Sequence, residues 1–70
     1  MRLSRHAKNE LRRLRGSKAD VERVIDHPVR VDRDSFGKPR YTGYIKGIRV
    51  RIVVALDEPD FVVTLHKRRN

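Results

Sequence analysis

The chain has 70 residues and no cysteine, and its 18 lysines and arginines against 9 aspartates and glutamates give a formal net charge of +9. This length predicts one domain, 1–70, with a single small core, because a chain of this size buries only roughly 60% of its unfolded surface. The absence of cysteine excludes disulfides and thiolate metal sites. No apolar run approaches the ~20 residues that span a membrane, and the charged start of the chain is unlike a signal peptide, so we expect a cytoplasmic protein.

The first part of the chain has the pattern of two short helices. Apolar residues recur there at helical spacing and form one stripe: Leu3, Ala7, Leu11 and Leu14. They predict a helix over about 5–15, with Ser4 as its N-cap. Ser17 and Asp20 have the spacing of a capping box and predict the start of a second helix. That helix ends before Pro28, since the residue before a proline avoids helical geometry.

The remainder predicts strands. Alternating patterns and turn signals divide it into four runs, 29–32, 40–46, 48–56 and 61–66, in addition to a short edge strand at 1–3 and a basic tail at 67–70. Lys46-Gly47 predicts a tight hairpin turn. Two apolar rows are expected to be buried against the helices: Ile48, Val50, Ile52 and Val54, and Phe61, Val63 and Leu65. Leu56 continues the alternation of the first row. The expected fold is α+β, with two N-terminal helices packed on one face of a 3–4-stranded antiparallel sheet.

The basic residues are polarised along the sequence. Six lie between Arg2 and Arg15 with one acid, and five lie between Lys38 and Arg51 with none. The acids gather at 20–26, 32–34 and 57–60, which we expect to lie away from the basic surface. This distribution favours a phosphate-binding surface over a generally solubilising one.

The predicted outer sheet face carries residue types suited to phosphate chemistry. Arg49, Arg51, Thr64 and His66 share it, together with either the Tyr41 or the Tyr44 side of the neighbouring strand. Cleavage of RNA without a metal needs one group to remove a proton, another to donate one, and cations on the phosphate. Imidazole titrates near neutral pH, and the guanidinium fork donates two hydrogen bonds to a phosphate.

His6, near the start of the first helix, is the second candidate for proton transfer. The catalytic set is therefore His6, His66, Thr64, Arg49 and Arg51, and the candidates for RNA binding are Tyr44, Lys46, Arg40 and Arg13. Simpler roles are also open: His6 can hydrogen-bond Glu10, His66 can be an ordinary exposed strand residue, and His27 suits the C-terminal end of a helix. The three histidines lack metal-ligand spacing, so neither a metal nor another cofactor is expected.

Several short segments resemble a small bacterial domain-of-unknown-function family that is grouped with the RelE/ParE-like toxins, within a wider set that includes colicin-type tRNA-cleaving domains. They are Ser4-Arg5-His6-Ala7, Ser17, the Val24 to Pro28 segment and Val62-Val63-Thr64. The resemblance implies two helices on a curved antiparallel sheet that holds RNA on its exposed face. It matches His6 and Thr64 to the family pattern, and Arg49 and Arg51 by general placement. The C-terminal tyrosine of the RelE type is absent, since His66 and the basic tail occupy that region.

The leading hypothesis is a toxin-type, metal-independent endoribonuclease that binds RNA, ribosome-bound or transfer RNA included, on its basic sheet face. An acidic antitoxin is the protein partner implied by the resemblance. Two alternatives remain open: a non-catalytic RNA- or ribosome-binding module that uses the same face, and a ParE-like toxin that acts on a protein target.

Overall fold

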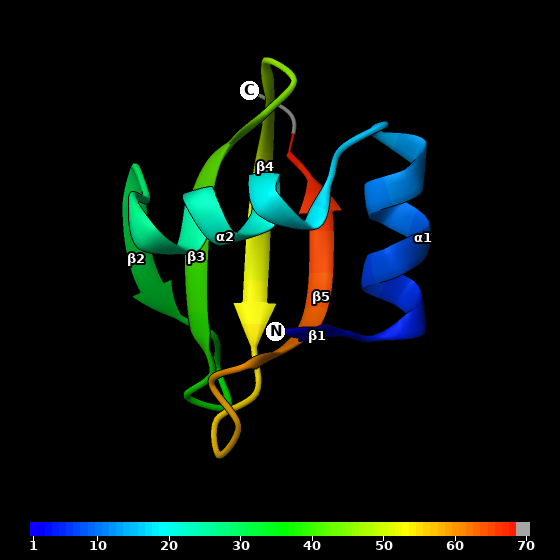
Figure 1. Ribbon diagram of the computed structural model, residues 1–70. Coiled ribbons are helices and arrows are strands. Elements are labelled where there is room, and N and C mark those ends of the chain that lie inside the picture. Colours follow the sequence, from blue (N-terminus) through cyan, green and yellow to red (C-terminus); the bar gives the residue numbers. More distant parts are fainter. Residues whose placement is uncertain (69–70) are drawn as a thin grey trace.

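The computed structural model describes residues 1–68, in which two helices and five strands follow one another along the chain. They are β1 (Arg2–Leu3), α1 (Arg5–Arg13), α2 (Lys18–Asp26), β2 (Arg30–Arg33), β3 (Pro39–Ile45), β4 (Ile48–Val54) and β5 (Phe61–Lys67) (Figure 1). The α+β class is as predicted. Residues 69–70 of the predicted basic tail lie outside the described part. No helix within residues 1–68 combines the length and the apolar character that crossing a membrane requires.

The strands form one mixed sheet in the order β1-β5-β4-β3-β2. Strands β2 to β5 pair antiparallel, whereas β1 pairs parallel with β5. The expected sheet of 3–4 antiparallel strands is therefore wrong in number and in kind. The fifth strand is β1, and the Arg2 and Ser4 amides fix it by donating to the carbonyls of Asp60 and Val62 at 2.8 and 2.9 Å. Two residues carry too little alternation to reveal a pairing partner.

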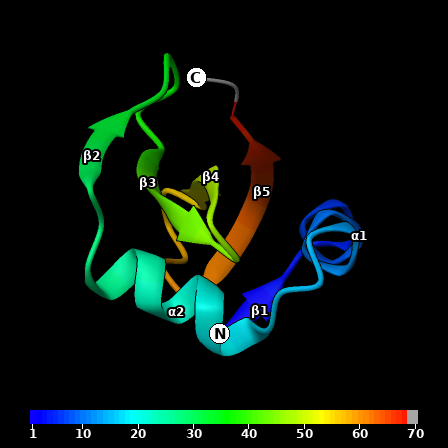
Figure 2. The same cartoon turned by 90° about the horizontal axis from the view of Figure 1, so that it is seen from above.

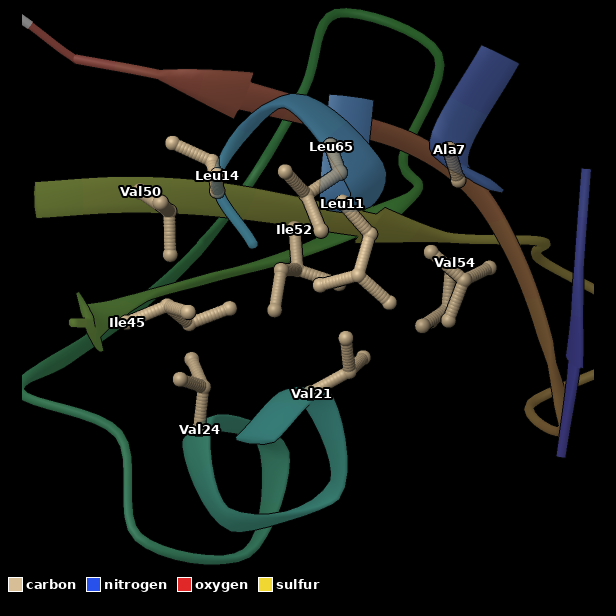
Figure 3. Packing of buried hydrophobic residues seen from close by; sticks show 11 residues of the cluster. Ala7, Leu11, Leu14, Val21, Val24, Ile45, Val50, Ile52, Val54 and Leu65 are labelled. Carbon is tan, nitrogen blue, oxygen red and sulfur yellow. The ribbon is translucent and has the colours of Figure 1, made fainter. Parts of the chain in front are cut away.

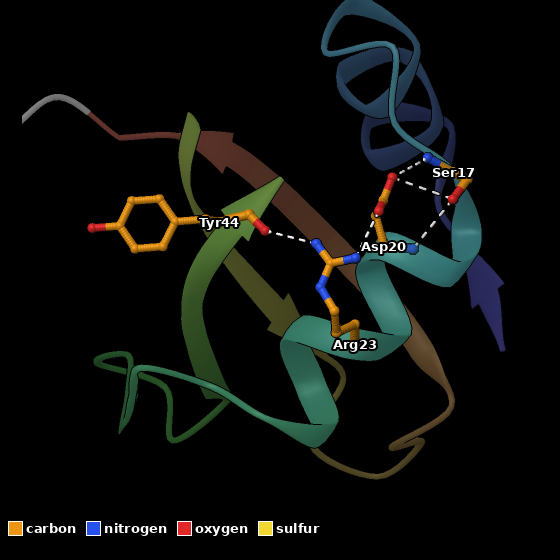
Figure 4. Close-up of polar contacts among 4 residues, drawn as sticks. All are labelled: Ser17, Asp20, Arg23 and Tyr44. Carbon is orange, nitrogen blue, oxygen red and sulfur yellow. Dashed lines mark hydrogen bonds and ion pairs between the residues drawn. The ribbon is translucent and has the colours of Figure 1, made fainter. Parts of the chain in front are cut away.

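Both helices begin at the predicted caps. The Ser4 hydroxyl accepts a hydrogen bond from the Ala7 amide at 3.0 Å, and the Ser17–Asp20 capping box is present. Helix α1 ends at Arg13, two residues before the predicted end, and Arg15 turns the chain with a φ of 57°. In α2, Arg23 binds both Asp20 and the main-chain carbonyl of Tyr44 on β3 (Figure 4). This contact ties α2 to the sheet.

The sheet has an inner face, which packs against the helices, and an outer face, which does not. Helix α2 crosses β3 and β4 on the inner side, and α1 runs beside β5 (Figures 1 and 2). Buried side chains from both helices and three strands meet there (Figure 3): Ala7, Leu11, Leu14, Val21, Val24, Ile45, Val50, Ile52, Val54, Val62 and Leu65. Figure 2 shows that β2 and β5 curve away from α2, so the outer face is concave.

A β-bulge corrects one of the two predicted apolar rows. Val54 pairs with Val62 but Val53 pairs with Thr64, so Val63 is an extra residue in β5. Val62 is therefore buried in place of the predicted Val63. Phe61, also predicted to be buried, is only partly covered.

The other predicted row is buried from Val50 to Val54. Leu56 continues the same alternation but is 61% exposed, because β4 ends at Val54. Ile48, at the start of β4, is only partly buried against the core. The alternation of apolar residues thus continues to residue 56, whereas strand β4 ends at Val54.

Candidate functional site

The register of the sheet arranges the outer face in rows that cross the strands. One row contains Arg30, Thr42, Arg51 and His66, each opposite the next. Side chains opposite each other on one sheet face have Cβ atoms about 4.5–5.5 Å apart. Arg51 and His66, two of the predicted catalytic residues, are therefore direct neighbours.

The structure brings His6 to the end of this row. Its ring centroid lies 5.5 Å from that of His66, and the ring planes are tilted by 60°. Ser4 sets the position of His6: its hydroxyl caps α1 and donates a hydrogen bond to the Val63 carbonyl at 2.5 Å, which fixes the start of the helix against β5. Both imidazoles are exposed. Two histidines sixty residues apart in sequence thus form one pair beside Arg51.

Within residues 1–68, the structure does not contain the hydrogen bond between His6 and Glu10 that the sequence left open. Glu10 lies one turn along α1 and pairs with Arg13, with the carboxylate oxygen 3.0 Å from the guanidinium nitrogen. Arg13, a predicted RNA-binding residue, therefore forms an exposed ion pair with Glu10 on the helix and is not among the residues that line the cavity of the outer face. His6 keeps its exposed position next to His66.

A shallow cavity of about 260 Å³ opens on the outer face beside the histidine pair. Four predicted site residues line it: Arg40, Arg51, Thr64 and His66. Val53 and Val63 give it an apolar part, because the bulge in β5 turns Val63 outward together with Thr64. A small apolar surface with a few convergent polar groups is typical of ligand sites.

Arg51 is a partly buried cation of this surface. Its Nε atom is buried and makes no hydrogen bond within residues 1–68. Burial, together with the neighbouring charges of Arg68 and Arg40, lowers the pKa of Arg51, although its guanidinium remains charged. Several like charges held around a partly buried guanidinium destabilise the fold unless an anion binds among them.

Two of these cations were not among the predicted site residues. Arg30 lies in the same cross-strand row as Arg51, and the Arg68 amide donates to the Arg49 carbonyl at 2.8 Å. Composition cannot identify them, because the chain has 18 lysines and arginines. The signal that finds them is the strand register, which a single sequence leaves open where strands are joined by irregular turns.

Asp32 and Asp34 correct the expectation that the acids lie away from the basic surface. Asp32 sits opposite Arg40 on the outer face, and its carboxylate accepts two hydrogen bonds from that guanidinium at 2.8 and 2.9 Å. This fork holds the pKa of Asp32 below its usual value. Asp34 lies in the turn after β2 and lines the cavity together with Lys38.

The remaining predicted residues lie along the outer face toward the β3–β4 hairpin. Tyr44 sits opposite Arg49 and is 48% exposed, and its ring points away from α2 (Figure 4). Tyr41 lies on the inner side and packs against the core, so the Tyr44 side faces outward. Lys46 forms the hairpin turn with a φ of 53°, followed by Gly47 at 77°, which confirms the predicted tight turn. These residues flank the cavity and do not line it.

Comparison of the chain with models of known protein families, with curated protein sequences and with solved structures finds no match in any of the three. Among residues 1–68, no three His, Asp or Glu side chains gather in a way that could hold a metal ion.

Proposed function

We propose that this chain is a metal-independent endoribonuclease that binds RNA on its concave outer sheet face. The observation that carries the proposal is the pair of exposed imidazoles of His6 and His66, with ring centroids 5.5 Å apart, beside the cross-strand neighbour Arg51. Two imidazoles that can exchange protons with the substrate and a neighbouring guanidinium that can bind its phosphate are the groups that the reaction needs.

In the proposed reaction, one imidazole is neutral and the other protonated when RNA binds. The neutral ring takes the proton of the ribose 2′-hydroxyl, and the 2′-oxygen forms a bond to phosphorus. The bond from phosphorus to the 5′-oxygen breaks, and the protonated ring donates its proton to that oxygen. The products are a 2′,3′-cyclic phosphate and a free 5′-hydroxyl, and the two imidazoles have exchanged protonation states.

The arginines supply the electrostatic part of the mechanism. Arg51 is partly buried and its Nε atom has no hydrogen-bond partner within residues 1–68, so its guanidinium can stabilise the negative charge that develops on the phosphate. The Thr64 hydroxyl lines the same cavity and can donate to a phosphate oxygen. Arg49 and Tyr44 lie one row farther along, where they can bind a neighbouring phosphate and stack on a base.

The proposal extends to the toxin class by the resemblance to RelE/ParE-like proteins. That resemblance places His6 and Thr64 in the family pattern, and both residues lie at the proposed site. A toxin of this type would act on RNA in the cytoplasm and would be held inactive by an acidic antitoxin, for which the net charge of +9 offers a complementary surface.

The test is cleavage of a single-stranded RNA in the presence of EDTA, comparing wild type with His6→Ala, His66→Ala and His27→Ala. His27 is the matched control, since it is an exposed histidine at the C-terminal end of α2. Each of the first two variants is expected to lose about 10²–10⁴-fold in rate, and His27→Ala none. An RNA with a 2′-deoxyribose at the cleaved position should remain intact.

The same experiment separates the alternatives. Salt-dependent RNA binding without any cleavage would replace the enzyme with the RNA-binding module, because the cluster of arginines around Arg51 would then serve binding alone. Absence of RNA binding would favour a protein target, as in the ParE-like alternative. Equal activity of wild type and both histidine variants would remove the two-histidine mechanism.

A further inference from the structure

We infer that the cavity beside the histidine pair holds the base next to the cleaved phosphodiester, and that Asp34 makes this position prefer cytosine over uracil. The inference rests on the proposed function and names a specificity-determining residue for it. It is carried by the hydrogen bonds of the turn between β2 and β3, which leave Asp34 with one oxygen engaged and one available.

The turn fixes the orientation of the Asp34 carboxylate. Oδ1 accepts hydrogen bonds from the backbone amides of Phe36 and Lys38, at 2.9 and 2.8 Å. The main chain of Asp34 is bound as well: its amide donates to the Lys38 carbonyl at 2.9 Å, and its carbonyl accepts from Gly37 at 3.0 Å. Gly37 adopts a φ of 85°, which suits glycine and closes the turn. Because Oδ1 is committed to the turn, recognition falls to Oδ2.

Asp34 stays ionised in this position. Partial burial acts against its charged form, but the amides of Lys38 and Phe36 outweigh burial and hold the pKa of Asp34 below its usual value. An ionised carboxylate only accepts hydrogen bonds. Asp34 lines the cavity, and its Oδ2 atom offers an acceptor and no donor.

The rest of the cavity fits a nucleobase. Val53 and Val63 provide apolar contact for the face of a ring, and Lys38 and Arg40 provide donors around it, which leaves Arg51 for the phosphate. A base in this open position cannot be paired in a double helix, so the expected substrate is single-stranded RNA. Beside the cavity, Phe36 is 78% exposed, with the Lys38 ammonium 4.9 Å from its ring centroid.

The two pyrimidines differ at the atom that Asp34 would meet. Cytosine presents the N4 amino group, a donor that an aspartate can accept, whereas uracil presents the O4 oxygen, an acceptor. Uracil would place that oxygen against a charged acceptor and leave Oδ2 unpaired. A hydrogen bond to a charged group contributes enough for a preference on the order of tenfold.

The experiment uses 2′-O-methyl cytidine and uridine hexamers, which bind but lack the attacking hydroxyl, and measures their affinities by fluorescence anisotropy. Wild type is expected to bind the cytidine hexamer about tenfold more tightly. In Asp34→Asn, the amide oxygen can accept the same two turn hydrogen bonds, and its NH₂ group then replaces Oδ2 as a donor. That variant is expected to reverse the preference toward uridine.

Two further variants complete the test. Asp57→Asn makes the same change of charge at an exposed residue outside the cavity and should keep the cytidine preference. Asp34→Ser keeps an acceptor for the turn but has no second oxygen, so it should bind both hexamers equally. Equal binding of both hexamers by wild type, absence of binding, or an unchanged preference in Asp34→Asn would overturn the inference. A cytidine preference in a protein that does not cleave RNA would refute the proposed enzyme and leave base recognition standing.

Discussion

The two faces of one sheet show opposite relations between stability and charge. On the inner face, Val50, Ile52 and Leu65 are completely buried within a cluster of apolar side chains. On the outer face, Arg51 is partly buried among cations, with an Nε atom that has no hydrogen-bond partner in residues 1–68. The inner face stabilises the fold, whereas on the outer face Arg68 and Arg40 repel Arg51, and the Asp32 carboxylate offsets this repulsion only in part.

This difference indicates which residues the fold needs and which only the proposed function needs. Conformational entropy leaves a small domain with little net stability, so repulsion on the outer face is a real cost that burial on the inner face must offset. Substitutions on the inner face should therefore reduce stability and leave the RNA affinity of the folded molecules intact. Substitutions of outer-face cations should instead reduce the RNA affinity and leave the stability of the fold intact.

The largest effect is expected for Ile52→Ala on the inner face. Ile52 is fully buried, and removing its side chain leaves a cavity in the core, so the free energy of unfolding should fall by about 2–5 kcal/mol. Leu56→Ala is the control, because Leu56 belongs to the same alternating sequence pattern but is 61% exposed, and its effect should stay within about 0.5 kcal/mol. Urea unfolding measures both values. Similar losses in the two variants would contradict the observed end of β4.

The next largest effect is expected for Arg51→Met, which keeps an unbranched apolar stem and removes the charged guanidinium. RNA affinity should fall about 10- to 100-fold, since a hydrogen bond to a charged phosphate is lost. The logarithmic salt dependence of binding should become shallower by about one unit. The melting temperature should stay the same or rise, because repulsion from Arg68 and Arg40 is relieved.

Arg12→Met is the matched control for that substitution. Arg12 is exposed on α1, so this substitution removes the same charge from a different surface. Its effect on RNA affinity should be several-fold smaller than that of Arg51→Met. Equal losses would mean that net charge, and not the outer sheet face, determines binding, and a lower melting temperature of Arg51→Met would show that the fold needs this arginine.

The sequence predicts the inner face better than the outer face, and the reason is physical. Helical spacing, the Ser4 and Ser17 caps and the Lys46-Gly47 turn each depend on residues close in sequence, and each is confirmed. The bulge that buries Val62 in place of Val63 depends on pairing with another strand and leaves no local signal. Alternation alone assigned the wrong residues there.

The same distinction holds for the site. Arg51, Thr64 and His66 share a face because of strand alternation, which the sequence shows directly. The sequence does not predict the approach of His6 to His66, because the distance between them depends on where α1 packs against the sheet. The positions of the two acids can be predicted only when the strand register is known. Asp32 faces Arg40 and Asp34 lines the cavity, although their place in the sequence indicates a separate acidic region.

The smallest expected effect comes from Asp32→Asn, which removes the one carboxylate that pairs with a cation of the outer face within residues 1–68. The hydrogen bonds from Arg40 hold the pKa of Asp32 below the ordinary aspartate value of about 3.9, so its ionised form stabilises the folded state. That contribution is fully present above the unfolded pKa and is lost as the pH falls through the lower folded pKa. Wild type should therefore melt slightly above Asp32→Asn at pH 7, and the difference should disappear in acid.

RNA binding by Asp32→Asn should change in the opposite direction. The substitution raises the charge of the outer face by one and releases the Arg40 guanidinium from a carboxylate that now accepts both of its hydrogen bonds. Affinity at pH 7 should rise, by less than tenfold, while thermal stability falls. Weaker RNA binding would show that Asp32 positions Arg40 for the ligand and does not compete with it. Either result identifies what the pair does, because a carboxylate kept on a basic surface either limits the binding of phosphate or orients the arginine that binds it.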